Sequence, residues 1–375
     1  MHTRKHITDC TLTIVFVLLI FIPCIGTVFH WDFYPLQGEN RLLAERPVWG
    51  SIPVSQYPEK FEAWFCDHFG FRNTFIRRYN RTIRELFKIQ SPQVIFGQDD
   101  WLFYNKDSIM KDFLGYHKLS DKDLLIWKDK LLTRKNKLAG KGITYRFVVV
   151  PNKCNVYTKK MPEALQRSEA EIKRIEQLQA CLKDTEAPQP LYLQDALKEA
   201  SKTEQVYFKN DCHWNEAGSY AGYKEIINSL TNEYPGITPL PLELFPREIK
   251  PHYGDLSDKL LGLGKSSGVP RNHVLPLNNR IEIEEEIIEA PEQWGHCPVG
   301  KVIISNNPDK KLTLLVFHDS FAYYGWMPLM QATFGKTIFI QSRPNEFGID
   351  YAIDRYKPDI VVEEWMERFL QQPNE

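Results

Sequence analysis

Two short segments of the chain carry the residue types that acyl-transfer chemistry requires. Asp211 and His213 lie two positions apart, and Ser320 directly follows Asp319. A serine hydroxyl becomes a nucleophile when a histidine removes its proton, and a carboxylate fixes the tautomer of that histidine and stabilises its charged form. We therefore interpret Ser320 as a candidate nucleophile, His213 as its general base and Asp211 as the orienting carboxylate.

Each of these segments is a weak signal by itself. An Asp-x-His pattern arises by chance in many proteins, where the histidine packs against a local turn. A serine that follows a strand often does no more than cap the next helix. The hypothesis therefore depends on the fold, which must bring nucleophile, base and carboxylate together at the strand ends of one sheet.

Composition and spacing narrow the classes of function. The chain of 375 residues has a net charge of -1 and 43% hydrophobic residues, so it supports a sizeable core but offers no basic surface for a nucleic-acid backbone. Asp211, His213 and His318 could supply metal ligands, but none of them belongs to a helical His-x-x-x-His pair, and the chain has no CxxC pair. We expect no metal, no other cofactor and no nucleic-acid partner.

Strands and helices alternate along the chain. Residues 143–150 and 311–317 are runs rich in apolar and β-branched residues, typical of buried parallel strands, and the second run ends just before Ser320. Further strands are expected at 94–97, 101–104, 191–193, 205–208, 337–341 and 360–362, and helices at 61–87, 121–138, 168–182 and 216–230. This alternation predicts an α/β fold with a mainly parallel sheet and helices on both faces. Ligands bind beyond the carboxyl ends of the strands in such sheets.

Two parts of this pattern need separate mention. The helix at 168–182 is expected to begin at an N-cap serine, Ser168. Residues 233–310 are less regular, with several prolines and one acidic strand candidate near 281–288. We interpret them as an insertion or loop region over the sheet.

The N-terminal segment 10–29 has no charged residue, and at about 1.5 Å per residue it is long enough to cross roughly 30 Å of hydrocarbon. Arg4 and Lys5 precede it, so the positive-inside rule leaves the remaining chain outside the cytoplasm. A cleaved signal peptide is the alternative. The length of the apolar run, and the poor cleavage site that residues 25–27 offer, favour an uncleaved anchor.

The chain resembles the SGNH-hydrolase-like domain of the alginate O-acetylation proteins (the AlgJ and AlgX type) and of their relatives in other exopolysaccharide clusters. The similar blocks follow one another in the order and spacing of that family over most of the chain. They are Glu39-Asn40-Arg41 with Pro47, Phe69-Gly70-Phe71-Arg72, Val94 to Tyr104, Val149-Val150-Pro151-Asn152-Lys153 with Tyr157 and Pro162, Asp211-x-His213-Trp214, Asp319-Ser320-Phe321, Lys357-Pro358-Asp359-Ile360-Val361, and Glu367-Arg368.

The resemblance implies an SGNH-hydrolase-like (flavodoxin-like) fold in which the histidine block precedes the serine block, a permuted order compared with ordinary lipase-like hydrolases. It implies the roles already given to Ser320, His213 and Asp211. It also implies two partners: a polysaccharide acceptor, and a multipass membrane acyltransferase of the MBOAT type that passes acetyl groups across the membrane to this domain.

Five more residues are candidates for contacts with the oxyanion or the substrate. They are Asn152, Trp214, Tyr323, Tyr324 and Arg343. The asparagine could donate to the tetrahedral oxyanion, beside the backbone N–H groups of the serine turn. The three aromatic residues could form a platform for a sugar, and the arginine could bind an anionic one.

We expect three parts of the chain: a cytoplasmic tip and transmembrane signal-anchor (1–30), a stem or linker (31–60) and an SGNH-hydrolase-like acetyltransferase domain (61–375). Together with the resemblance, these parts imply an O-acetyltransferase held by the inner (cytoplasmic) membrane, with its catalytic domain in the periplasm. We expect it to acetylate an exopolysaccharide through an acetyl-serine intermediate. A carbohydrate acetylesterase with the same triad and a non-catalytic polysaccharide-binding scaffold are the alternatives. Transfer and hydrolysis differ only in acceptor binding and exclusion of water.

Overall fold

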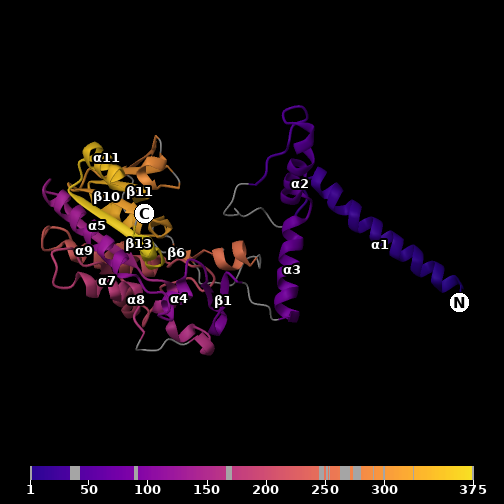
Figure 1. Cartoon of the computed structure of the whole chain (residues 1–375), viewed down its shortest axis with the longest axis horizontal. Helices are drawn as coiled ribbons and strands as arrows, with labels where there is room; N and C mark the ends of the chain where they lie inside the picture. The colour runs from indigo at the N-terminus through magenta and orange to yellow at the C-terminus, as the bar shows by residue number, and fades with distance from the viewer. Residues whose placement is uncertain are drawn as a thin grey trace. The chain divides into compact units, whose positions relative to one another are not determined.

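The chain folds into two compact units, one made of residues 1–91 and 255–266 and the other of residues 92–254 and 267–375. The second unit contains all the sequence-predicted site residues that the structure describes. The predicted division at residues 30 and 60 stays a prediction. The computed structural model describes residues 2–33, 43–87, 92–165, 171–244, 249–250, 252, 254–261, 271–272, 280–289, 291–298, 300–323 and 325–373 (Figure 1).

The first unit begins with helix α1 (His2–Val28), whose segment Cys10–Val28 has a mean hydropathy of 2.6. Among the described residues, this is the one helix that is long and apolar enough to cross a membrane. It fits a single-pass anchor or a signal sequence. Two short helical turns, η1 (Val54–Gln56) and η6 (Asp255–Leu260), belong to the same unit.

The predicted helical stretch 61–87 is divided between two helices, α2 (Tyr57–His68) and α3 (Arg72–Phe87). The chain turns between them at Gly70, which lies directly against the backbone of Gly26 in α1. A Cβ atom at Gly70 would lie 2.4 Å from the carbonyl carbon of Gly26, so this close approach requires glycine.

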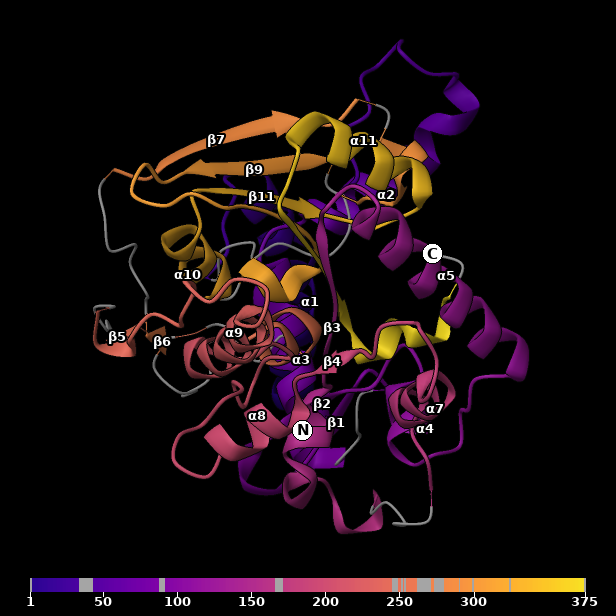
Figure 2. The ribbon, with the colours of Figure 1, turned by 90° about the vertical axis from the view of Figure 1, so that its left-hand side faces the viewer.

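The second unit is built on a seven-stranded sheet with the order β4-β3-β13-β10-β11-β9-β7 (Figure 2). The first five strands are parallel, and β9 and β7 extend one edge in antiparallel pairs. The predicted α/β fold with a mainly parallel sheet is therefore confirmed. The strands are β3 (Thr144–Val150), β4 (Leu191–Tyr192), β7 (Glu282–Ile287), β9 (Lys301–Asn306), β10 (Thr313–His318), β11 (Lys336–Gln341) and β13 (Ile360–Met366).

Helices cover both faces of this sheet because successive side chains of each strand point to opposite faces. In β3, Phe147 and Val149 pack into one buried cluster, and Val148 and Val150 pack into the other. The helices of the first cluster are α5 (Asp121–Ala139), α7 (Arg174–Leu182) and α11 (Glu346–Tyr356), and those of the second are α8 (Gln194–Ala200), α9 (Glu216–Leu230) and α10 (Trp326–Thr333).

Short elements complete the second unit. The predicted strand pair around residues 98–100 is confirmed as the antiparallel pair β1 and β2. The short strands and α-helices are β1 (Val94–Phe96), β2 (Leu102–Tyr104), β5 (Ile249–Lys250), β6 (Arg271–Asn272), β8 (Gly295–His296), β12 (Arg343–Pro344), α4 (Ile109–Phe113) and α6 (Lys153–Val156). The single turns are η2 (Gln98–Asp100), η3 (Thr158–Lys160), η4 (Glu163–Leu165), η5 (Leu242–Leu244), η7 (Pro291–Trp294), η8 (Ser320–Tyr323) and η9 (Glu367–Gln371).

The predicted start of the helix at 168–182 is wrong, because α7 begins at Arg174. The backbone N–H of Lys173 donates to Glu176 Oε2 at 2.8 Å, which caps the helix at that point. Ser168, the expected N-cap, lies outside the described residues.

Two further expectations are corrected by the sheet. Residues 205–208 do not form a strand; they contribute one bridge, between Tyr207 and Trp214. Three of their four carbonyl groups accept hydrogen bonds from side chains, and the fourth, that of Val206, accepts the backbone N–H of Asn215 in the same loop. The acidic strand predicted near 281–288 is confirmed as β7, but it does not lie over the sheet as expected, because it forms the edge strand that pairs with β9. Charged side chains are usual on such an exposed edge.

Candidate active site

Ser320, His213 and Asp211 form one hydrogen-bonded chain. Ser320 begins η8 directly beyond the carboxyl end of β10, and the loop before α9 carries the other two residues. His213 Nε2 lies 2.8 Å from Ser320 Oγ, and His213 Nδ1 lies 2.7 Å from Asp211 Oδ1. The structure thus brings together the three residues that the sequence analysis selected for nucleophilic chemistry.

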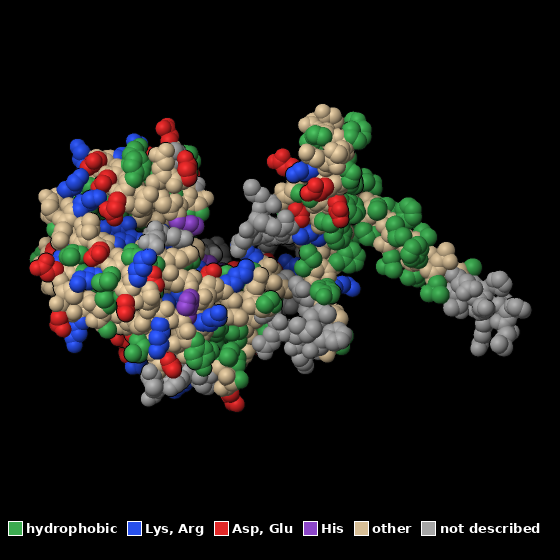
Figure 3. Space-filling view, in the orientation of Figure 1, with side chains coloured by type: hydrophobic (Ala, Val, Ile, Leu, Met, Phe, Trp, Pro, Cys, Tyr) green, Lys and Arg blue, Asp and Glu red, His purple; other side chains and the backbone are tan. Residues whose placement is uncertain are grey.

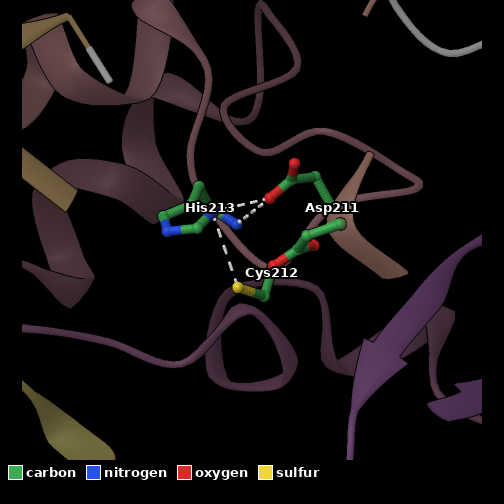
Figure 4. A group of neighbouring side chains, drawn as sticks. Asp211, Cys212 and His213 are labelled. Carbon is green, nitrogen blue, oxygen red and sulfur yellow. Dashed lines mark hydrogen bonds and ion pairs between the residues drawn. The ribbon is translucent and has the colours of Figure 1, made fainter. Parts of the chain in front are cut away.

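The loop geometry holds Asp211 and His213 close to each other (Figure 4). Asp211 Oδ1 also accepts the backbone N–H of His213 at 2.9 Å, and Cys212 Sγ lies 3.5 Å from His213 Nδ1. The three side chains place an oxygen, a sulfur and a nitrogen within 4.8 Å of one another. Because the oxygen and nitrogen are already hydrogen-bonded to each other, we assign no metal to them.

The charge of Asp211 decides which atoms are hydrogen-bond donors among Ser320, His213 and Asp211. Burial by itself would raise the pKa of Asp211, but the charges and hydrogen bonds of His213 and His252 lower it well below its ordinary value. Asp211 is therefore ionised and can only accept, so His213 Nδ1 must carry a proton. In the neutral ring, Nε2 is then the acceptor for the Ser320 hydroxyl.

The pKa of His213 is shifted in the opposite direction. Burial disfavours its positive charge, but Cys212 and Asp211 outweigh burial and raise the pKa of His213 well above its ordinary value. The site therefore favours the imidazolium, which is the form that follows removal of a proton from serine.

A second histidine, His252, lies on the other side of the same carboxylate. Its Nε2 is 2.8 Å from Asp211 Oδ2, and its ring stacks on that of Phe208 with centroids 3.7 Å apart. The sequence analysis missed this residue. No sequence signal pointed to it, since His252 is one of three isolated histidines in the irregular segment 233–310 and belongs to no recognisable motif.

A buried lysine holds the loop that carries Asp211. Lys153 Nζ donates to the backbone carbonyl oxygens of Phe208, Lys209 and Asp211 at 3.0, 3.2 and 2.7 Å. Such a cation satisfies several carbonyl groups that face one point. Lys153 belongs to a sequence block that suggested the family, but its structural role could not be read from that block.

A buried aspartate fixes the turn that carries Ser320. Asp319 Oδ1 accepts the backbone N–H of Phe321 at 2.9 Å, and Asp319 Oδ2 accepts that of Met366 in β13 at 3.0 Å. The Phe321 N–H, one of the backbone groups of the serine turn expected to bind the oxyanion, is therefore already hydrogen-bonded to Asp319. Glu364 Oε2 accepts the Asp319 N–H at 3.0 Å, and burial together with the charge of Asp319 raises the pKa of Glu364 well above its ordinary value.

His318 precedes this turn and is buried. Its Nδ1 lies 2.6 Å from the backbone carbonyl oxygen of Asp319, so it is the protonated ring nitrogen. Burial lowers the pKa of His318 to about 4, which leaves the ring neutral at pH 7. His318 contacts the serine turn rather than Asp211.

Ser320 opens into a pocket of about 110 Å³. Arg343 lines this pocket, and its guanidinium lies 4.1 Å from the ring centroid of Phe369. Its contact with an anionic sugar stays a prediction. Arg368 also lines this pocket, and the same arginine lines a neighbouring pocket with Asn152 and Cys212. Figure 3 shows one face of the chain as a space-filling view, in which acidic and basic side chains are interspersed over the second unit.

The side chain of Asn152 makes no hydrogen bond within the described part of the chain that would occupy the donor group predicted for the oxyanion. Its side chain is buried, and neither the amide nitrogen nor the amide oxygen has a hydrogen-bond partner among the described residues. Its backbone N–H donates to Glu367 Oε2 at 2.9 Å, which fixes the loop without using the side chain. A buried amide without a hydrogen-bond partner is unusual, and it is expected where the amide donates to an oxygen of a bound substrate.

The predicted aromatic platform is not formed by Trp214. This side chain is fully buried in the core, and its Nε1 donates to the carbonyl oxygen of Phe321 at 3.1 Å, so no sugar can stack on it. Tyr323 is 37% exposed and packs edge-on against His318. Tyr324 lies outside the described residues.

The fold and the site define the class of this protein. A mainly parallel sheet carries a serine, a histidine and an aspartate in hydrogen-bonded sequence beyond its carboxyl edge, as in α/β enzymes that use a serine nucleophile. A family model described as SGNH hydrolase-like domain, acetyltransferase AlgX, matches residues 94–283, about half of the chain. The chain belongs to this family of acetyltransferase-type SGNH-hydrolase-like domains, as its sequence blocks predicted.

The first two of the following solved structures, with TM-scores above 0.5, share this fold at low sequence identity. Bacillus cereus PatB1 is 16% identical with a TM-score of 0.55, over 74% of this chain and 96% of its own. A DHHW family protein from Eubacterium siraeum is 14% identical with a TM-score of 0.54, over 75% and 93%. The O-acetyltransferase domain of Pseudomonas putida AlgJ is 16% identical with a TM-score of 0.47, over 76% and 94%. No curated protein sequence matches the chain.

Proposed function

We propose that the protein is a membrane-anchored, extracytoplasmic O-acetyltransferase that moves acetyl groups onto hydroxyls of an exopolysaccharide. The observation that carries the proposal is the 2.8 Å contact between Ser320 Oγ and His213 Nε2, with Asp211 on the other ring nitrogen. Membership of an acetyltransferase family supports acetyl as the transferred group.

In the first half-reaction, His213 Nε2 accepts the proton of Ser320 Oγ while the oxygen attacks the carbonyl carbon of an acetyl ester. The tetrahedral intermediate collapses, the bond to the leaving oxygen breaks, and that oxygen takes the proton from His213. The product is acetyl-Ser320. Asp211 stabilises the imidazolium throughout, which agrees with its lowered pKa.

In the second half-reaction, a sugar hydroxyl gives its proton to His213 Nε2 and attacks acetyl-Ser320. The bond from the acetyl carbon to Oγ breaks, and Ser320 regains its proton from His213. The side-chain N–H of Asn152 is the proposed donor to the oxyanion in both halves, because it is buried and has no partner among the described residues.

Arg343 is the proposed contact for an anionic sugar, because it lines the same pocket as Ser320. The apolar helix α1 is the proposed anchor in the inner membrane, which would leave the catalytic domain in the periplasm. A multipass membrane acyltransferase is the proposed source of acetyl groups.

The test uses the purified full chain in detergent with an acetyl-ester donor, with and without an oligosaccharide acceptor. We expect acetylated oligosaccharide, and a mass increase of one acetyl group on the peptide that contains Ser320 when the acceptor is left out. The Ser320→Ala variant should give neither product. The Ser201→Ala variant, changed at the C-cap of α8, is the control and should behave as the parent chain.

Two outcomes would replace the acetyltransferase function with one of the two alternatives. Free acetate without acetylated sugar, at every acceptor concentration, would assign the acetylesterase function. Polymer acetylation in cells that survives Ser320→Ala but is lost when the whole gene is deleted would assign the non-catalytic scaffold function.

A further inference from the structure

We propose that His252 is a positioning residue that orients Asp211 for its contact with His213. This inference rests on the proposed acyl-transfer role of the Ser320–His213–Asp211 chain. His252 Nε2 lies 2.8 Å from Asp211 Oδ2, whereas His213 Nδ1 lies 2.7 Å from Asp211 Oδ1. The two histidines therefore hold different oxygens of the same carboxylate.

The direction of the second hydrogen bond follows from the charge of the carboxylate. The lowered pKa of Asp211 keeps it ionised, so it offers acceptors only. His252 Nε2 must therefore carry a proton and donate it. A donor on each oxygen fixes the rotation of the carboxylate about its Cβ–Cγ bond, and this keeps Oδ1 directed at His213. The N–H of His252 also gives the buried Oδ2 a hydrogen-bond donor.

The segment that carries His252 is packed closely against the loop of Asp211. The rings of His252 and Phe208 stack at a centroid distance of 3.7 Å and an angle of 11° between planes. Two residues later, a Cβ atom on Gly254 would lie 1.9 Å from the backbone oxygen of Asn210. Stacking and close backbone contact together determine where the imidazole of His252 lies.

Packing alone is the competing explanation, since an imidazole on a phenyl ring also contributes buried area. The two explanations separate when the ring and the donor are removed one at a time. His252→Phe keeps an aromatic ring against Phe208 but has no N–H to donate. His252→Gln loses the ring but keeps an N–H at a similar distance from the backbone.

The experiment measures hydrolysis of 4-nitrophenyl acetate by the full chain in detergent. We expect His252→Phe to lower kcat about tenfold or more with KM changed by less than about twofold, because a hydrogen bond to a charged group is lost while ester binding is kept. His252→Gln should recover most of the lost activity. The proposal is overturned if His252→Phe keeps the parent kcat, or if the folded His252→Gln variant falls as far as His252→Phe.

A spectroscopic measurement reports on positioning directly. The proton between His213 Nδ1 and Asp211 should give a far-downfield proton resonance, and His252→Phe should shift or broaden it while His252→Gln leaves it nearly unchanged. An unchanged resonance in His252→Phe would also overturn the proposal. Failure of the proposed function is recognised separately, because Ser320→Ala would then keep the esterase activity of the parent chain whatever the His252 variants do.

Discussion

His213 Nε2 and Ser320 Oγ lie 2.8 Å apart, although 107 positions separate the two residues in the chain. The two residues lie on different loops. The side chain of Asp319 bonds the serine turn to the backbone of β13, and the ammonium group of Lys153 holds the histidine loop through three backbone carbonyl groups. The contact therefore depends on two separately fixed loops that meet at one edge of the sheet, and this explains why buried charged groups surround it.

The negative charge of Asp211 should be essential for the action of His213 as a general base. Asp211→Asn keeps the size of the side chain but presents an N–H to one of its histidines and removes the negative charge. We expect kcat for ester hydrolysis to fall by about three to four orders of magnitude. Asp129→Asn, on an exposed position of α5, is the matched control and should change nothing. Activity above about a tenth of the parent value in Asp211→Asn would contradict this role.

The pH dependence of the reaction should report the pKa of His213. The protonated ring has no lone pair on Nε2, so kcat/KM rises as the pH rises through that pKa. Because the pKa of His213 is raised, the midpoint should lie above about 6.5, the ordinary value for histidine. A pH profile of ester hydrolysis measures it. A midpoint at or below the ordinary value would show that His213 is not the titrating base.

The side chain of Asn152 should stabilise the oxyanion. Asn152→Ala removes the unpartnered amide but keeps the backbone N–H that bonds to Glu367, so the loop should hold its shape. We expect kcat to fall about a hundredfold with little change in KM. The control is Asn136→Ala, at an exposed position of α5. A change confined to KM would instead assign Asn152 to substrate binding.

Close backbone packing beside the histidine loop should make Gly218 intolerant of substitution. Gly218 lies in the first turn of α9, and a Cβ atom there would lie 2.1 Å from the backbone oxygen of Val206. We expect Gly218→Ala to lower the free energy of unfolding by about 1–3 kcal/mol, because the backbone must shift. Urea denaturation checks this. Gly236→Ala, with no atom within 4 Å of the added Cβ, should unfold at the parent midpoint or slightly above it.

Local patterns in the sequence were enough to predict the central strands. The runs rich in apolar residues at β3 and β10 are long because both faces of these strands are buried. A segment with so many apolar side chains is unfavourable outside the core of the sheet. The edge of the sheet could not be predicted in the same way. β7 is acidic and largely exposed, so its pairing with β9 depends on the neighbouring strand rather than on its own side chains.

Distance along the chain was a poor guide to which residues line the pocket of Ser320. Trp214 adjoins His213 in sequence, yet its ring points into the core and bonds to the serine turn. Neighbouring residues of an extended loop point in opposite directions, so one can reach the pocket while the next is buried. Arg343, by contrast, lines the pocket of Ser320 because β12 brings it there.

The sequence alone determined the residue types available for chemistry, their order along the chain, the apolar N-terminal helix and the alternation of strands and helices. These properties depend on side-chain chemistry and local periodicity. Only the tertiary structure decided that His252 shares Asp211 with His213, and that Lys153 holds their loop. Those contacts join segments far apart in the chain, and their geometry follows from how the whole sheet and its loops pack.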